Sequence, residues 1–273
     1  MNLELEIGHL QIQRDFYNEA IHLLAQTGYS ELTSVIGPII TANETSLRSI
    51  LLLAEHEHFR DVIILSRPFL ECILNVGFIC AKGNSAVIDS KKYAYQKGYR
   101  DLFREIEVNG FTYQSPYVAH KSEFEKSAPD LMKQSLNDFS KNGREISNWT
   151  SETAKQKLEL IGKKYGEQVN GFLAFAFFAI YRDISEIIHN SYYGIRIYIG
   201  MQQKDTSAFE SSDEAAAYFG QHQKKLAALI LQQINCSICA LLNILSQDFK
   251  TKSLEDLYRR SNEQILEYAD SRK

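Results

Sequence analysis

The chain has 273 residues, of which 44% are hydrophobic and 23% are charged, so its composition suits a folded protein with a sizeable core. Its 30 Lys and Arg residues against 34 Asp and Glu residues give a net charge of -4, which excludes a protein that coats nucleic acid through bulk positive charge. With only 4 Pro and 14 Gly, the chain has too few turn-forming residues to favour a β-sandwich or a many-stranded barrel.

Apolar residues recur at helical spacing along nearly the whole chain, and this pattern predicts an all-α fold. In the first part of the chain, a turn or cap is expected at 43–46 and a kink at Pro68, with helices over 3–27, 32–42, 47–56, 59–80 and 87–108. Further helices are expected over 130–139, 153–165, 169–190, 213–249 and 253–269. Residues 191–200 alternate well enough for a strand, although a helix fits them nearly as well, and 201–212 are expected to form a loop.

Residues 109–148 differ from the rest of the chain because they are polar and contain two Pro and two Gly residues. They are expected to form an insertion around one short helix. No internal repeat or low-complexity linker divides the sequence. We therefore expect a single helical domain over 1–273, built as an antiparallel helical bundle with a polar insertion.

The N-terminal residues are charged where an export signal needs an apolar stretch, so a cytoplasmic protein is expected. The apolar run at 171–181 is shorter than the roughly 20 residues that cross a bilayer, and no membrane contact is expected. The four cysteines form no disulfide framework. Cys236 and Cys239 have the spacing of a redox or zinc half-site, but they lie in an apolar helix, which favours packing in the core.

The most informative polar residues lie in the apolar helix predicted over 169–190. Arg182 and His189 are seven residues apart and fall within roughly 20° of each other around a helix axis. Glu186 lies on the same stripe. A fixed positive charge beside a group that moves protons near neutral pH can support metal-free RNA cleavage. The spacing alone favours a simpler interpretation, in which Arg182 pairs with Glu186 and His189 caps the helix.

A second polar stripe crosses the apolar helix at 59–80, where Arg67, Glu71 and Asn75 repeat every four residues. Charged groups among apolar side chains need partners. Two interpretations are equally favoured: Arg67 and Glu71 pair within the helix, or Glu71 reaches Arg182 or His189 and orients it.

A third pattern, Glu-x-x-His, has the spacing by which helices bind dinuclear metal centres. It occurs four times, at Glu6, Glu19, Glu55 and Glu186. Two of these pairs share one expected helix, and Glu and His are common at helix ends. The sequence therefore predicts no metal ligands and no cofactor, and a dimetal carboxylate bundle remains a minor alternative.

Arg182-x6-His189, with Asp183 directly after the Arg, resembles the signature of the HEPN superfamily. Two longer strings, 65–71 and 181–191, resemble the landmarks of a bacterial family of uncharacterised helical proteins, namely an Arg-Pro-hydrophobic-Leu-Glu helix and a later Ser-x-x-hydrophobic-His-x-Ser helix. The similarity covers residues 45 to 200. The resemblance implies a HEPN-like bundle with extra N- and C-terminal helices. It also implies a homodimer that acts as a metal-independent ribonuclease in toxin or antiviral systems.

The leading hypothesis is a HEPN-like endoribonuclease of a bacterial defence or toxin-antitoxin system, with RNA as substrate. His189 would be the general acid or base and Arg182 the phosphate stabiliser. The residues expected to orient them or to contact substrate are Asp183, Glu186, Asn190, Arg67 and Glu71. The alternative hypothesis is a non-catalytic helical interaction module that binds a protein partner, in which the same polar residues fix the helix register.

Overall fold

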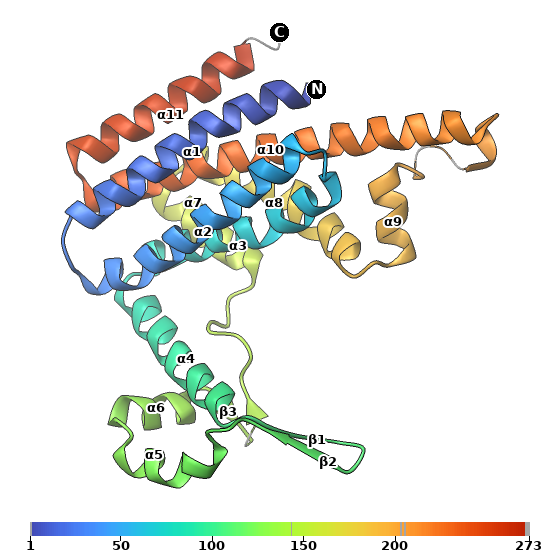
Figure 1. The fold of residues 1–273 in the computed structure, drawn as a ribbon. Helices are drawn as coiled ribbons and strands as arrows, with labels where there is room; N and C mark the ends of the chain where they lie inside the picture. The colour runs from blue at the N-terminus through green and yellow to red at the C-terminus, as the bar shows by residue number, and fades with distance from the viewer. Residues whose placement is uncertain (1, 143, 203, 205, 271–273) are drawn as a thin grey trace. The chain divides into compact units, whose positions relative to one another are not determined.

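The computed structural model describes residues 2–142, 144–202, 204 and 206–270, without the side chains of Arg182, Asp183 and Thr206. Within these residues the chain forms eleven α-helices and four very short strands (Figure 1). The all-α prediction is therefore confirmed. The chain divides into two compact units. The first takes in the chain up to Ala81 and from Ala154 onwards, and the second spans Lys82–Thr153.

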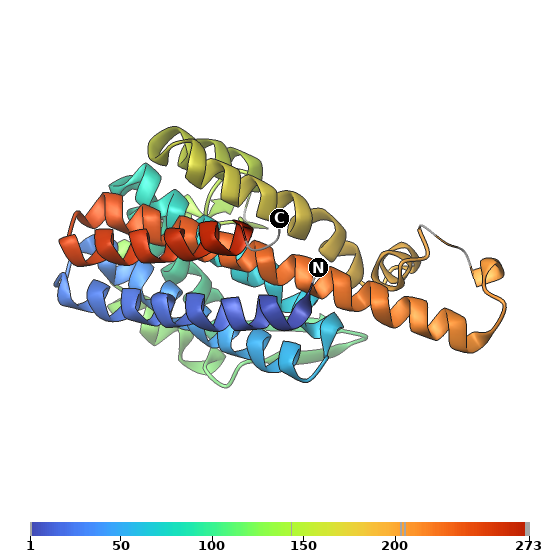
Figure 2. The same ribbon diagram turned by 90° about the horizontal axis from the view of Figure 1, so that it is seen from above.

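The first unit is a helical bundle, and its long helices lie side by side in both views (Figures 1 and 2). Its helices are α1 (Leu3–Gln26), α2 (Glu31–Glu55), α3 (Phe59–Lys82, whose last residue belongs to the second unit), α7 (Ala154–Tyr165), α8 (Glu167–Ile188), α9 (Tyr192–Ile199), α10 (Ser212–Phe249) and α11 (Lys252–Asp270), with a 3-10 turn, η2, at Thr206–Ala208. These bounds agree closely with most of the predicted helices.

Helix α10 forms the centre of the first unit and packs against α1, α8, α9 and α11. Its residues from Ala227 to Ser246 are nearly all buried, whereas its N-terminal third is largely exposed. Cys239 is buried in this helix and Cys236 is partly buried. Burial raises the pKa of these thiols to about 12 and about 11 respectively, which keeps them protonated and unreactive. The structure thus agrees with core packing rather than redox chemistry.

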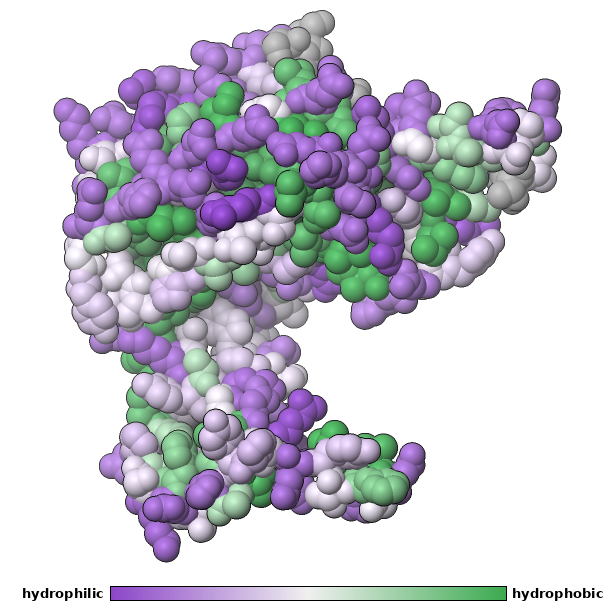
Figure 3. All heavy atoms as spheres, viewed as in Figure 1, coloured by the Kyte–Doolittle hydropathy of each residue, from purple (hydrophilic) through white to green (hydrophobic). Residues whose placement is uncertain are grey.

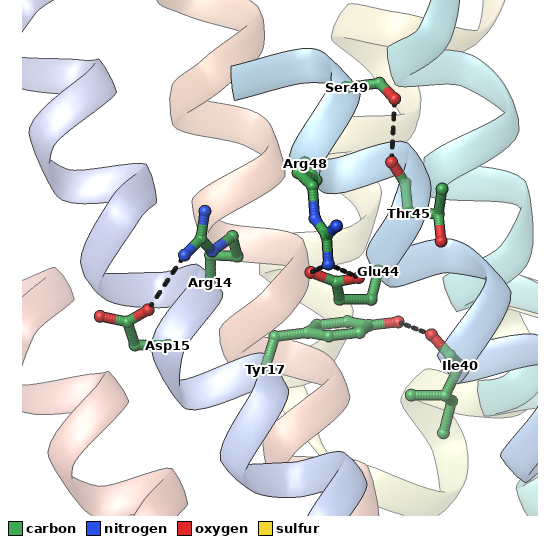
Figure 4. Close-up of polar contacts among 8 residues, drawn as sticks. All are labelled: Arg14, Asp15, Tyr17, Ile40, Glu44, Thr45, Arg48 and Ser49. Atoms are coloured by element: carbon green, nitrogen blue, oxygen red, sulfur yellow. Dashed lines mark hydrogen bonds and ion pairs between the residues drawn. The ribbon is translucent and has the colours of Figure 1, made fainter. Parts of the chain in front are cut away.

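The turn expected at 43–46 does not exist, because α2 continues unbroken from Glu31 to Glu55. The polar residues at 43–46 remain helical, and two of them form side-chain contacts there. Buried Asn43 donates a hydrogen bond to the Phe69 carbonyl at 3.3 Å, and Glu44 pairs with Arg48 one turn later at 3.3 Å. Beside them, the Tyr17 hydroxyl of α1 donates to the Ile40 carbonyl at 3.1 Å and joins α1 to α2 (Figure 4). Tertiary contacts therefore override the local preference of these residues for a cap.

Helix α8 does not lie at the bundle centre as the sequence suggested. One face is buried, through residues such as Leu173, Ala176 and Ile180, but the other face is open to solvent. Phe175 is 52% exposed and Phe178 is 78% exposed. The prediction was wrong because α8 is apolar on both faces, so its composition does not reveal which face the core covers.

The second unit begins with α4 (Asn84–Leu102), which ends six residues before the helix expected over 87–108. A hairpin of β1 (Glu105–Val108) and β2 (Phe111–Gln114) follows. The unit is completed by η1 (Val118–His120), α5 (Lys121–Ser127), α6 (Asp130–Asp138) and the two-residue strands β3 (Ser140–Lys141) and β4 (Arg144–Glu145). Helix α6 confirms the short helix expected at 130–139.

Two of the described helices, α3 and α10, are long and apolar enough to cross a membrane. The fold buries 61% and 83% of their apolar windows. Such burial against other helices is also typical of core helices in water-soluble proteins. These helices therefore carry no argument for a membrane location, and the cytoplasmic location stays a prediction.

Candidate active site at the corner between α8 and α9

The candidate site lies where α8 ends and α9 begins. Position 182 and His189 fall on the same stripe of α8 as Phe175 and Phe178, all within about 60° around the axis. Phe175, Phe178 and His189 on this stripe are exposed to solvent. The side chains of Arg182 and Asp183 lie outside the described part of the structure, so their predicted contacts, including the pair with Glu186, are not placed.

His189 is the residue that caps the C-terminus of α8. Its backbone N–H donates to the Ser185 carbonyl at 3.2 Å, and its side chain is exposed. Among the side chains that the structure describes, none forms a hydrogen bond or an ion pair with the His189 ring. Within the described part of the chain, the ring is therefore accessible to a substrate, which a histidine fully engaged by the helix end would not be.

Asn190 gives the chain its sharp turn after His189, because its backbone is left-handed, with φ 51°. The guanidinium of Arg60, on α3, donates to the Asn190 side-chain oxygen and lies 3.5 Å from the Ile187 carbonyl. This contact fixes the end of α8 against α3. Asn190 was predicted as an orienting residue, and the structure places it in the backbone turn beside His189.

Ser191 starts α9 and links it to α8. Its hydroxyl accepts a hydrogen bond from the Gly194 N–H at 2.9 Å and donates to the Glu186 carboxylate at 2.8 Å. The two helices meet so closely here that a Cβ on Gly194 would lie 2.2 Å from the Glu186 carbonyl oxygen. Glu186, predicted to orient the catalytic residues or to contact substrate, thus holds the corner together through Ser191.

The second polar stripe is separate from His189. Arg67 pairs with Glu71 within α3 at 3.1 Å, and its guanidinium lies over the Tyr181 ring at 4.6 Å from the centroid. Asn75 accepts a hydrogen bond from Lys157 at 2.7 Å. Arg67 therefore contacts α8 through Tyr181, and Glu71 pairs within its own helix, as the first of the two interpretations expected. No contact between Glu71 and His189 occurs in the described part of the structure.

Metal ligands do not gather in the described part of the chain, where no group of three or more His, Cys, Asp or Glu side chains could hold an ion. The glutamates of the Glu-x-x-His pairs contact other side chains instead. Glu55 accepts from Gln11 at 2.9 Å and Glu19 pairs with Arg260 at 2.6 Å. Buried Glu6 accepts from the Tyr268 hydroxyl.

Two residues that build the corner, Arg60 and Gly194, were not predicted from the sequence. A glycine near the start of an expected element can signal a close backbone approach, but only the fold shows that Glu186 is the neighbour. The exposure of Phe175 and Phe178 was not predicted either. Their spacing from Arg182 and His189 was readable in the sequence and would have placed all four on one face.

Residues 35–207 match the model of a family of unknown function, DUF5677. The match includes α3, α8 and the whole α8–α9 corner, and it leaves α1, α10 and α11 outside. No curated protein and no solved structure matches the chain.

Proposed function

Because the chain belongs to DUF5677, a family whose function is unknown, we propose its activity from the site itself: a metal-independent, HEPN-like endoribonuclease that acts as a homodimer. The proposed system is bacterial defence or a toxin-antitoxin pair, as the resemblance implies. The observation that carries the proposal is the exposed His189 ring, which forms no hydrogen bond or ion pair with any side chain that the structure describes. It lies on the same stripe as position 182, at the end of a helix that Arg60 contacts through Asn190.

The proposed chemistry needs two proton transfers. The imidazole of His189 takes the proton of a ribose 2′-hydroxyl, whose oxygen then attacks the adjacent phosphorus and displaces the 5′-oxygen of the next nucleotide. His189 of the second copy gives a proton to that leaving oxygen. Arg182 stabilises the charge that develops on the phosphate. The products are a 2′,3′-cyclic phosphate and a 5′-hydroxyl end.

In this proposal the remaining site residues hold the two catalytic residues in place or contact the substrate. Arg60 with Asn190, and Ser191 with Glu186, fix the backbone on either side of His189. A catalytic group held by such contacts keeps its geometry without reorganising in the transition state. Asp183 is proposed to orient Arg182 or to contact RNA, and Arg67 with Glu71 supports α8 from α3 through Tyr181.

The dimer is proposed to form through the exposed stripe of α8. Phe175 and Phe178 flank a groove of about 180 Å³ that is lined by apolar residues of α3, α8, α9 and α10. Exposed aromatic residues beside an apolar groove are typical of protein interfaces. Pairing two copies along this stripe would bring their His189 residues toward one composite cleft.

The decisive assay measures cleavage of mixed RNA by the full chain in EDTA, with end-group analysis of the products. His189→Ala should lower the rate by roughly 10²–10⁴-fold, the usual contribution of a general acid or base. His22→Ala is the matched control, since His22 is an exposed histidine on α1. Equal cleavage by wild type and His189→Ala, or no cleavage by wild type of any RNA in a broad set, would contradict the enzyme proposal.

The dimer is tested separately by sedimentation. Phe178→Asp should convert a wild-type dimer to a monomer, whereas Tyr29→Asp, at another exposed aromatic position of the first unit, should not. A wild-type protein that remains monomeric at micromolar concentration would remove the composite cleft from the mechanism.

The second candidate function is a non-catalytic interaction module, and the same exposed stripe favours it. In that case a different protein covers Phe175 and Phe178, and the polar residues only fix the corner. It predicts that Arg182→Ala and Phe178→Asp abolish partner binding while wild type cleaves no RNA. These results would distinguish it from the ribonuclease.

A further inference from the structure

The β1–β2 hairpin of the second unit is amphipathic. Its register pairs Ile106 with Tyr113 and Val108 with Phe111, so these four apolar residues share one face. They are between 44% and 68% exposed, and Figure 3 shows hydrophobic residues at the surface of the hairpin. The opposite face carries Glu105, Glu107, Thr112 and Gln114. An isolated two-stranded hairpin is marginally stable in water, so an apolar face left open on one is a feature to explain.

The two free edges of the hairpin differ in charge. The Ser115 N–H donates to the Arg104 carbonyl at 2.9 Å, and because hydrogen-bonded pairs alternate along an antiparallel ladder, Ile106 and Val108 also turn their backbone groups inward. The outward N–H and C=O groups of β1 therefore belong to Glu105 and Glu107. Those of β2 belong to the neutral residues Thr112 and Gln114.

Neither Glu105 nor Glu107 forms an ion pair with any residue that the structure describes, and both are exposed. A second copy of β1 paired to this edge would place carboxylate opposite carboxylate, which is destabilising. A strand with Lys or Arg at alternate positions would instead match the two carboxylates. The residues between its basic positions would extend the apolar face.

We propose that β1 is a docking edge for an extended, basic segment of a partner protein, which adds antiparallel to it as a third strand. Backbone hydrogen bonds to Glu105 and Glu107 hold the segment, as in other cases of strand addition. Its alternate Lys or Arg residues pair with the two carboxylates. Its alternate apolar residues pack beside Ile106 and Val108 and complete a three-stranded amphipathic sheet.

The test uses the full chain and an eight-residue peptide of alternating Lys and Val. Single-residue amide hydrogen exchange should show protection at Glu105 and Glu107 on peptide addition, and none at Thr112 or Gln114. A peptide with Glu in place of Lys should not bind. Neither should a peptide methylated on its lysine amides, which keeps the charge and the side chains but loses the backbone donors.

Two variants sharpen the test. Glu107→Lys should weaken binding roughly tenfold, since it turns a favourable cross-strand pair into a repulsive one. Glu123→Lys, an equal charge change on the exposed helix α5 of the same unit, should not. Glu105→Lys/Glu107→Lys should bind the acidic peptide instead.

Three outcomes would overturn the proposal. The first is binding that survives lysine-amide methylation, since it would be charge attraction without strand addition. The second is protection at Thr112 and Gln114 that rises with protein concentration, since it would indicate a second copy on the other edge. The third is protection at Glu105 and Glu107 that is already complete in the free protein, or that never appears.

Discussion

Helices α8 and α10 are both rich in apolar residues, yet the fold uses them in opposite ways. The C-terminal two thirds of α10 contact other helices on all sides. Helix α8 buries one face and presents Phe175 and Phe178 to solvent. Apolar residues that the core does not need are available for another purpose. The comparison separates residues that maintain the fold from residues that are candidates for function.

The largest expected effect tests this separation within α8 itself. Ile180→Ala should lower the free energy of unfolding by about 2–5 kcal/mol, because Ile180 is fully buried and the change leaves a cavity. Phe178→Ala, two residues earlier, should change the unfolding free energy of the monomer by less than about 0.5 kcal/mol, since the Phe178 side chain is 78% exposed in the single chain and buries little surface when that chain folds. Urea denaturation measures both. Similar losses for the two variants would mean that the stripe is packed in solution.

The next effect concerns the corner that joins the exposed stripe to α9. Gly194→Ala should cost about 1–3 kcal/mol, because the added methyl group must displace the Glu186 carbonyl. Gly8→Ala in α1, where the added atom meets nothing within 4 Å, should be neutral or stabilising by up to about 1 kcal/mol. The measurement is the melting temperature of each variant compared with that of the wild type. An unchanged Gly194→Ala protein would show that the corner adjusts easily.

A smaller effect is expected from the contact between α3 and the end of α8. Arg60→Gln removes the guanidinium from Asn190 and should cost about 1 kcal/mol, the net value of a typical hydrogen bond. The same change should also lower the rate of the proposed ribonuclease, because it loosens the backbone next to His189. The loss of rate should be larger than the loss of folded protein alone would explain. A fall in stability with no change in rate would show that the contact between Arg60 and Asn190 does not contribute to catalysis.

The smallest effect is expected from His9, a buried histidine between α1 and α11. His9 is buried and stacks on Tyr268 at 4.6 Å between ring centroids. Burial lowers the pKa of His9 below its usual 6.5. The unfolded chain therefore takes up this proton at a higher pH than the folded chain, so the stability contributed by His9 is present above pH 6.5 and is lost as the pH falls below it.

His9→Gln should flatten this part of the pH profile, whereas His22→Ala, at an exposed position of the same helix, should leave it unchanged. The measurement is the free energy of unfolding between pH 5 and pH 7.5. A wild-type profile that shows no decline toward pH 5 would mean that His9 is solvated in solution.

The helical architecture was predictable because its signal is repeated in every turn. Periodic apolar residues located α1, α3, α7, α10 and α11 to within a few residues. The errors arose where a distant partner decides the local structure. Asn43 stays within α2, where the Phe69 carbonyl of α3 accepts its hydrogen bond, and this partner cannot be identified from local spacing. Residues 191–200 form the helix α9, one of the two structures expected for them, and Ser191 caps it by accepting a hydrogen bond from Gly194, three residues away.

The hairpin was a different kind of error, since its signal was present in the sequence. Asn109 and Gly110 both have positive φ, as a two-residue hairpin turn requires, and alternating residues flank them. The helical pattern predicted up to 108 concealed this signal. For the candidate site, the sequence located His189 and Arg182 on one stripe. It could not show that the stripe is exposed, because exposure depends on where α3, α9 and α10 pack.

The packing of α8 against α10 affects how the protein can be divided for experiments. The segment shared with the family ends at residue 207, before α10 begins at Ser212. A fragment cut at that boundary would keep every residue of the proposed site but would lose α10, against which α8 packs. Such a truncated protein would expose this apolar face and is expected to aggregate, so recombinant boundaries should follow the bundle and not the family match.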